Sequence, residues 1–200
     1  MARGPLYLET ERLVVRSFAE RDISEIVDYS ACGPTDASRL RNIDWEPTPE
    51  GVRAWWTPMA AMGIDEAVRW LALVIEVKAL GRVVGNVGLR TESVVGHRQA
   101  LIGWLLGKAF EGRGYATEAT CVLLDHLFLS EGFHRAYART GADNERSRRL
   151  MERVGMRREG HFVRSGFHDG SWCDEYLYAV LDSEWLARRC DTGASVARAP

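Results

Sequence analysis

The sequence lacks both a segment long enough to cross a membrane and an excess of charge of one sign. Its longest apolar run, near residues 70–77, is far shorter than the roughly 20 residues of a spanning helix. The 26 basic and 28 acidic side chains leave a formal net charge of −2, without the basic excess that nucleic acid or an anionic membrane attracts. Residues 1–11 contain no apolar core of a secretory signal. We therefore expect a cytoplasmic protein with no membrane or nucleic-acid partner.

Cysteine is also scarce. The chain contains four cysteines, which are Cys32, Cys121, Cys173 and Cys190. No two of them have the Cys-x-x-Cys spacing that is typical of zinc and redox sites. We expect four free thiols in a reducing compartment and no metal. Lysine is scarcer still, since Lys78 and Lys108 are the only two among the 26 basic residues; we attach no function to that bias.

The length and composition favour one hydrophobic core. A chain of 200 residues with 46% hydrophobic side chains can bury a core without disulfides or metal. No proline- or serine-rich linker divides it. We expect one domain over residues 1–190, and a flexible tail over residues 191–200, where small and polar side chains predominate.

Hydrophobic periodicity predicts strands and helices in mixed order. Helices are expected at 20–31, 48–62, 114–131 and 144–154, with Asp22 and Thr48 as caps and Gly63, Gly132 and Gly155 as stops. Strands are expected at 13–16, 69–77, 82–89, 99–106 and 135–140, followed by a hairpin of 156–167 with 171–181. The order βααβββαβαββ predicts an α/β fold with a mixed, largely antiparallel sheet flanked by helices.

A glycine-rich segment, Gly112-Arg113-Gly114-Tyr115-Ala116, follows one predicted strand and opens the longest predicted helix. Glycines let successive backbone N–H groups converge, and the helix N-terminus adds its dipole, so this segment is suited to a phosphate group. A dinucleotide fingerprint fits poorly, because the preceding strand belongs to an antiparallel meander, and the P-loop pattern is absent. The residues alone leave three readings open: CoA, another phosphate ligand such as a nucleotide, or a turn without a ligand.

Six segments in order carry a family resemblance. They are Leu8-Glu9-Thr10-Glu11-Arg12-Leu13, Ile102-Gly103-Trp104, residues 112–119, residues 144–156, Arg158-Glu159-Gly160 and residues 174–179. Over residues 8–185 the chain resembles the GNAT superfamily of acyl-CoA-dependent N-acyltransferases, and most of all its ribosomal-protein-alanine acetyltransferases. The resemblance implies transfer of an acetyl group from acetyl-CoA to a primary amine, by direct attack in a ternary complex. The amine would belong to a small molecule, an antibiotic or a protein N-terminus, and the enzyme would be a monomer or homodimer.

The resemblance also implies where CoA binds. Strands 100–106 and 135–140 would run parallel and splay apart, with a backbone N–H near Leu106 facing the thioester oxygen. The implied cofactor-binding residues are Leu105, Leu106, Gly107, Gly112, Arg113, Gly114, Tyr115, Ala116, Thr117, Asn144 and Ser147. The family's loop pattern is Arg/Gln-x-x-Gly-x-Gly/Ala, whereas Glu111 occupies the first position here. A carboxylate facing a pyrophosphate would weaken binding, so we expect Glu111 to turn outward.

The proton donor for the departing thiolate is assigned by the same resemblance. Ser147 matches the family serine that lies near the sulfur. The alternatives are that Ser147 is a helix-surface serine and that Tyr137 or water supplies the proton. Asn144 would reach the cofactor arm with its amide, or would only cap the helix.

The base that would deprotonate the amine is less well defined. The strand position where similar enzymes carry a glutamate falls at Ser165 or Gly166. The available carboxylates are Asp174, Glu175 and Glu92, and a water-relayed base is an alternative. His97 and His168 are expected in solvent-facing turns.

The acceptor wall would come from the first two helices and the last hairpin. The aromatic and acidic residues of the first part are Trp45, Trp55, Trp56, Asp44, Glu46 and Glu50. They would suit a cationic amine; the favoured alternative is that Trp55 or Trp56 faces the core. A different class of function, a CoA-binding sensor or scaffold without turnover, also fits these residues.

Overall fold

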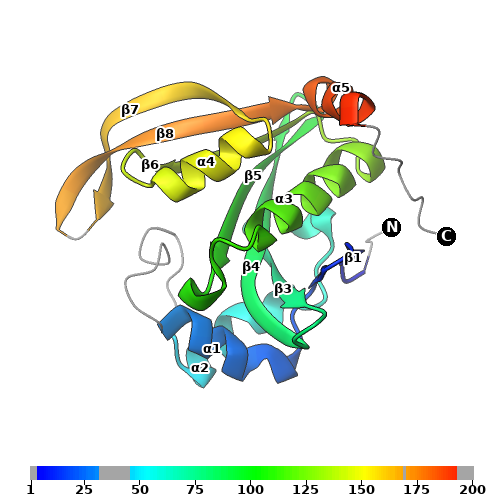
Figure 1. Ribbon diagram of the computed structural model, residues 1–200, viewed down its shortest axis with the longest axis vertical. Coiled ribbons are helices and arrows are strands. Elements are labelled where there is room, and N and C mark those ends of the chain that lie inside the picture. Colours follow the sequence, from blue (N-terminus) through cyan, green and yellow to red (C-terminus); the bar gives the residue numbers. More distant parts are fainter. Residues whose placement is uncertain (1–3, 32–45, 169, 193–200) are drawn as a thin grey trace.

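The computed structural model describes residues 4–31, 46–168 and 170–192 and contains one eight-stranded sheet (Figure 1). Its spatial order is β1-β2-β3-β4-β5-β6-β8-β7. The strands are β1 (Tyr7–Glu9), β2 (Leu13–Arg16), β3 (Leu71–Val77), β4 (Arg82–Val94), β5 (His97–Leu106), β6 (Arg135–Gly141), β7 (Arg157–His168) and β8 (Ser171–Leu181). Every neighbouring pair is antiparallel except β5 and β6. The predicted mixed, largely antiparallel sheet is therefore confirmed.

Helices flank this sheet. They are α1 (Ile23–Ala31), α2 (Pro49–Trp56), α3 (Tyr115–Asp125), α4 (Glu145–Arg153) and α5 (Asp182–Thr192). In Figure 1, α3 and α4 lie across the sheet, while α1 and α2 lie near the end of β5. The fully buried Leu123, Leu124 and Leu127 join a core that includes Leu73 and Ile75 of β3. Among the described residues, no helix is long and apolar enough to cross a membrane, and no group of three or more potential ligands could hold a metal ion.

The sequence analysis did not predict two elements, β1 and α5. Strand β1 is only three residues long, too short for a periodic signal, and pairs with β2 through Leu8 and Val15. Helix α5 is anchored by Trp185, which is 6% exposed and donates its indole N–H to Asp125 at 2.8 Å. Helix α5 runs to Thr192, two residues into the stretch predicted as a tail, and residues 193–200 lie outside the described part.

Helix ends also differ from the prediction. The segment expected to be helical over 20–31 begins with a 3₁₀ turn, Glu20–Asp22, and α1 starts at Ile23. Asp22 is the third residue of that turn rather than its N-cap. Helix α2 ends at Trp56, not at residue 62, and a 3₁₀ turn follows that contains Pro58, which has no N–H to continue the α-helical ladder.

The other differences concern the β4–β5 hairpin and the longest predicted helix. Strands β4 and β5 continue through the polar stretch that we expected to be a loop, because Val95 and Gly96 both have positive φ and close a two-residue hairpin turn. The helix predicted over 114–131 is α-helical to Asp125 and then forms a π-helical turn, His126–Ser130. Two of the predicted glycine stops are confirmed. Gly132, with a φ of 67°, comes after the π turn that extends α3, and Gly155, with a φ of 86°, comes after α4.

A buried ionic cluster connects β2 to the start of α1. Arg16, 8% exposed, donates to both carboxylate oxygens of Asp22, at 2.7 and 2.8 Å, and to Glu76 of β3 at 2.8 Å. Asp22 also accepts the backbone N–H of Ala19 at 2.8 Å. The hydrogen bond that Arg16 donates to Asp22 outweighs burial and raises the pKa of Arg16. This cluster holds α1 against the sheet.

Replacing Asp22 by alanine leaves a buried guanidinium with only one carboxylate. We expect Asp22→Ala to lower the free energy of unfolding by about 3 kcal/mol in urea denaturation. The control is Glu20→Ala, which removes an exposed ion pair to Arg53 and should cost about 0.5 kcal/mol. Equal losses for both variants would contradict a structural role for the buried cluster.

Candidate active site

The sheet opens between β5 and β6. Only three residue pairs join these strands, Gln99 with Arg135, Ala100 with Ala136 and Leu101 with Tyr137. Strand β5 nevertheless continues to Leu106, fully paired with β4 on its other side. The remaining length of β5 therefore has an edge that β6 does not cover, as the resemblance implied.

The backbone groups on this edge can be identified from the ladder. Arg98 O accepts the N–H of His134, the residue before β6, at 2.9 Å, so even-numbered residues of β5 face β6. At the other end the N–H of Gly107 donates to Val84 O beside β4 at 2.8 Å, so odd-numbered residues face β4. The N–H and C=O groups of Trp104 and Leu106 therefore point into the opening, whereas those of Leu105 point to β4.

The glycine-rich segment lies between β5 and α3. Gly112 and Gly114 both have positive φ, 75° and 82°, and a Cβ on Gly112 would meet nothing within 4 Å. Gly114 is the N-cap of α3 and has no side chain that could accept the first-turn N–H groups. The N–H groups of Tyr115, Ala116 and Thr117 thus open the helix, and the helix dipole favours an anion there. These residues fit a pyrophosphate.

The start of α3 is held by the chain's N-terminal part. The carboxylate of Glu118 accepts the hydroxyl of Thr10 at 2.5 Å and Nε of Arg12 at 2.7 Å. Arg12 also donates to the carbonyl of Arg113 at 3.1 Å and lies over the ring of Tyr115. Sequence analysis missed this clamp, although Thr10, Arg12 and Glu118 all belong to segments that carry the family resemblance.

Helix α4 begins beside the same segment. Asn144 caps it, because its Oδ1 accepts the backbone N–H of Ser147 at 3.0 Å, which confirms the capping role. Ser147 is half-buried in the first turn, and no described residue bonds its hydroxyl. Arg153, at the end of α4, donates to the hydroxyl of Thr117 on α3 at 3.0 Å. Helix α4 thus lies against the first turn of α3.

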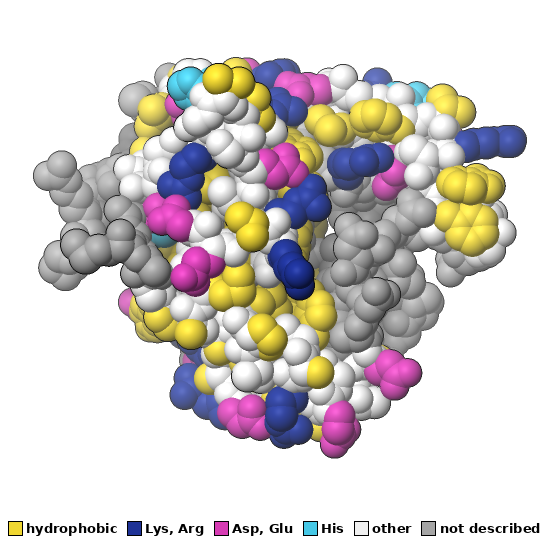
Figure 2. Space-filling model, turned by 180° about the vertical axis from the view of Figure 1, so that it is seen from behind, with side chains coloured by type: hydrophobic (Ala, Val, Ile, Leu, Met, Phe, Trp, Pro, Cys, Tyr) yellow, Lys and Arg dark blue, Asp and Glu magenta, His cyan; other side chains and the backbone are white. Residues whose placement is uncertain are grey.

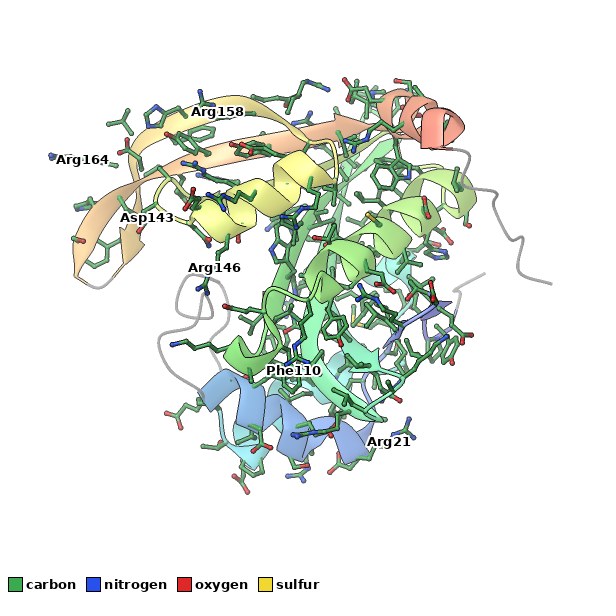
Figure 3. The ribbon with its side chains drawn as sticks, in the orientation of Figure 1. Arg21, Phe110, Asp143, Arg146, Arg158 and Arg164 are labelled. Carbon is green, nitrogen blue, oxygen red and sulfur yellow. The ribbon has the colours of Figure 1, made fainter. Side chains whose placement is uncertain are left out.

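The position of Glu111 only partly matches the expectation. Its side chain is 31% exposed and forms an ion pair with Arg146 of α4. Figure 3 shows Arg146 reaching from α4 toward the segment after β5, where Phe110 lies. Glu111 is therefore paired across the opening rather than simply turned outward.

A polar cluster lies on the sheet face opposite α4. Tyr178 of β8 bonds Glu152 of α4, so the alternate residues of β8, including Glu175, point to the other face, which Tyr137 and Arg139 share by register. Glu175 is 9% exposed and accepts Arg139 and the hydroxyl of Ser165, both at 2.8 Å. Ser165, at the strand position where similar enzymes carry a glutamate, thus lies next to a carboxylate that β8 supplies.

Tyr137 and Glu92 form a second contact on this face. The hydroxyl of Tyr137 donates to Glu92 at 2.8 Å, and Arg90 and Gln99 also bond that carboxylate. Burial and the contact with Glu92 raise the pKa of Tyr137, whereas for Glu92 the effect of burial is outweighed by the hydrogen bonds from Arg90 and Tyr137, which lower its pKa. Both groups are therefore engaged with each other at neutral pH.

Asp174 has a structural position. It accepts the backbone N–H of Arg164 at 2.9 Å and bonds His161 at 2.6 Å. Arg164 has a φ of 48° and lies where the β7–β8 register shifts between Phe162 and Gly166. The bond from Arg164, followed by that from His161, lowers the pKa of Asp174. This geometry suits a side chain that stabilises a bulge better than a base.

The expected acceptor wall is only partly described. Trp56 is 1% exposed and packs with Phe18 at 5.8 Å between ring centroids, which confirms the core reading for this residue. Trp55 is half-buried beside it, whereas Glu46 and Glu50 are exposed. Asp44 and Trp45 lie outside the described residues. His97 is exposed at the start of β5, and His168 ends β7.

Apolar side chains are exposed at the far end of the β7–β8 hairpin. Val163, Phe167 and Trp172 are 71%, 47% and 63% exposed, and the last two rings lie 5.3 Å apart. Figure 2 shows apolar side chains on this projecting part, while acidic and basic side chains alternate over the rest of that face. No segregated charge therefore marks this face.

Comparison with known proteins adds the family. Residues 12–157 match the family described as "Acetyltransferase (GNAT) domain". An uncharacterized N-acetyltransferase of Bacillus subtilis, YnaD, is 27% identical, with 90% of this chain and 99% of that protein covered. The [ribosomal protein uS5]-alanine N-acetyltransferase of Escherichia coli is 24% identical, with 91% and 94% covered. The structure of Mycobacterium smegmatis RimJ in complex with CoA-disulfide superimposes with a TM-score of 0.73 at 23% identity, covering 96% and 95%.

The clamp at the start of α3 predicts a pH dependence. Burial opposes the charge of Glu118, but the hydrogen bonds from Thr10 and Arg12 outweigh it and lower its pKa. A carboxyl with a lowered pKa in the folded state stabilises the fold above its unfolded pKa, about 4.3, and loses this effect as the pH falls through the folded value. Wild type should therefore melt at a higher temperature than Glu118→Gln near pH 7, and the difference should vanish in strong acid. A constant difference would exclude the ion pair as its source.

Proposed function

The chain belongs to the acetyltransferase (GNAT) family, and on that premise we propose that it transfers the acetyl group of acetyl-CoA to a primary amine by direct attack in a ternary complex. The observation that supports this best is the uncovered edge of β5, which ends beside the open N-terminus of α3. The edge suits the amides of a pantetheine arm, and the helix start suits a pyrophosphate.

Donor binding in this proposal uses backbone groups. The N–H groups of residues 115–117 hold the pyrophosphate, with Gly112 and Gly114 adopting the positive φ that residues with side chains rarely take. Trp104 and Leu106 hold the pantetheine arm through their N–H and C=O groups. Leu105 is not included, since its backbone groups face β4.

In the reaction a carbon–nitrogen bond forms and the carbon–sulfur bond of the thioester breaks. The amine nitrogen forms a bond to the thioester carbon, and negative charge develops on the carbonyl oxygen, where the N–H of Leu106 stabilises it. The carbon–sulfur bond breaks, and the departing thiolate takes a proton from the hydroxyl of Ser147, which recovers one from water. Tyr137 is less suited to this step, because its hydroxyl donates to Glu92.

The amine must lose a proton before or during attack. We propose Glu175 for this role, directly or through water, because it is the carboxylate nearest to the strand position where similar enzymes carry a glutamate. Its partners Arg139 and Ser165 fix its orientation. The acceptor is a primary amine of a small molecule, an antibiotic or a protein N-terminus, and the uS5-alanine relative supports the last of these.

The choice of CoA over other phosphate ligands predicts a selective stabilisation. Acetyl-CoA at 100 times its Kd should raise the free energy of unfolding by about 2.7 kcal/mol, whereas ATP and NAD at the same concentration should have much smaller effects. Gly114→Val should abolish the shift, because a β-branched residue is strained at a φ of 82°. Release of free thiol with a panel of amines tests turnover. Binding without release for every amine would favour a sensor over an enzyme.

The role of Ser147 predicts a kinetic effect without a binding effect. A group that acts as charge develops on sulfur contributes to the transition state, so Ser147→Ala should lower kcat at least about 10-fold. The Kd of acetyl-CoA should change by less than about threefold, and helix stability should hold, since alanine favours a helix. The control is Ser93→Ala, an exposed position on β4. A wild-type kcat for Ser147→Ala would remove this residue from the mechanism.

A further inference from the structure

Two arginines of α4 face the first turn of α3. Arg146 and Arg153 are seven residues apart, about two helical turns, and therefore lie on one side of α4. Leu150 lies between them on that side and is 6% exposed, which shows that this side faces the protein. Arg149 lies close to this side but is 66% exposed and pairs with Glu145 one turn earlier on α4, not with the loop or α3.

Arg146 contacts the residue that precedes the glycine-rich segment. Its guanidinium forms an ion pair with Glu111, three residues before Gly114. Arg153 bonds Thr117, three residues after Gly114. The α3 N-terminus, which suits a pyrophosphate, therefore lies between two contacts made by one side of α4.

Stability does not account for the ion pair of Arg146. Its side chain is 74% exposed, and exposed ion pairs contribute about 0–1 kcal/mol to folding. A guanidinium has five N–H donors in a planar fork, and Glu111 engages Nη1. The remaining N–H groups belong to an exposed side chain and are accessible to a ligand at this loop.

These N–H groups are suited electrostatically to phosphate oxygens. Glu111 occupies the first position of the loop pattern, where an uncompensated carboxylate would repel a pyrophosphate. The charge of Arg146 cancels that of Glu111, and a guanidinium matches phosphate oxygens well. Glu111 in turn holds a long, otherwise mobile side chain in position.

We propose that Arg146 binds the pyrophosphate of acetyl-CoA, and that Glu111 is a positioning residue that directs it there. The cation of this phosphate site is thus supplied by α4 rather than by the first residue of the loop. This inference rests on the proposed function, because it takes acetyl-CoA as the ligand.

Calorimetric titration of the full chain with acetyl-CoA and with its 3′-dephospho form tests the proposal. Arg146→Ala should raise the Kd of both ligands by about 10- to 100-fold, the range for a lost hydrogen bond to a charged group. The control Arg149→Ala should change neither by more than about threefold, and all variants should melt within a few degrees of wild type. A loss restricted to the 3′-phosphorylated ligand, or an equal loss for Arg149→Ala, would overturn the assignment.

Substitution of Glu111 distinguishes phosphate binding by Arg146 from an ion pair that only holds the loop in place. If the ion pair only pins the loop, Glu111→Ala should weaken binding as much as Arg146→Ala, and the double variant should equal either one. Under our proposal Glu111→Ala weakens binding by at most about threefold, and the double variant binds more tightly than Arg146→Ala because the repelling carboxylate is gone. A wild type that does not bind acetyl-CoA would refute the proposed function, whereas a binding wild type with an unaffected Arg146→Ala would refute this inference alone.

Discussion

The early parting of β5 from β6 is the constraint on which the rest of the site depends. Each strand has a complete antiparallel partner on its other side, β4 for β5 and β8 for β6, but the two share only three residue pairs. Because α3 follows β5 and α4 follows β6, both helices begin at the end of the sheet where these strands diverge. The opening therefore brings an unpaired strand edge and two helix starts together, and no other parallel pair exists in the described sheet to do so.

Contacts from distant parts of the chain stabilise this arrangement. Thr10 and Arg12 bond Glu118 across more than a hundred residues of sequence. The segment 8–13 and the segment 112–119, neither of which identifies the family by itself, thus contact each other in the fold. Its consequence for function is that the first turn of α3 is held in place before a ligand arrives, so that binding need not pay the entropy of ordering it.

The two sides of the opening use different chemistry. In our proposal the donor side relies on backbone N–H and C=O groups, whose positions depend on φ, strand pairing and helix starts. The other face of the sheet carries paired side chains, Glu175 with Arg139 and Glu92 with Tyr137. Backbone recognition tolerates changes of side chain, and under our proposal Glu111 can therefore replace a cation because another one, from Arg146, lies within reach. Side-chain recognition has no such tolerance, which is why the donor is easier to infer than the acceptor.

The sequence by itself determined the fold class, the order of most elements and the glycine-rich segment, because periodicity and glycine punctuation are local properties. It also located Gly132 and Gly155 as helix stops and offered a cap as one of two roles for Asn144. Only the tertiary structure decided that Asp174 stabilises a bulge, that Glu175 lies beside Ser165, and that Arg146 meets Glu111. Each of these contacts joins residues from different elements, or from opposite sides of a register shift. Strand register and helix placement, which no local pattern encodes, decide which charged side chains meet.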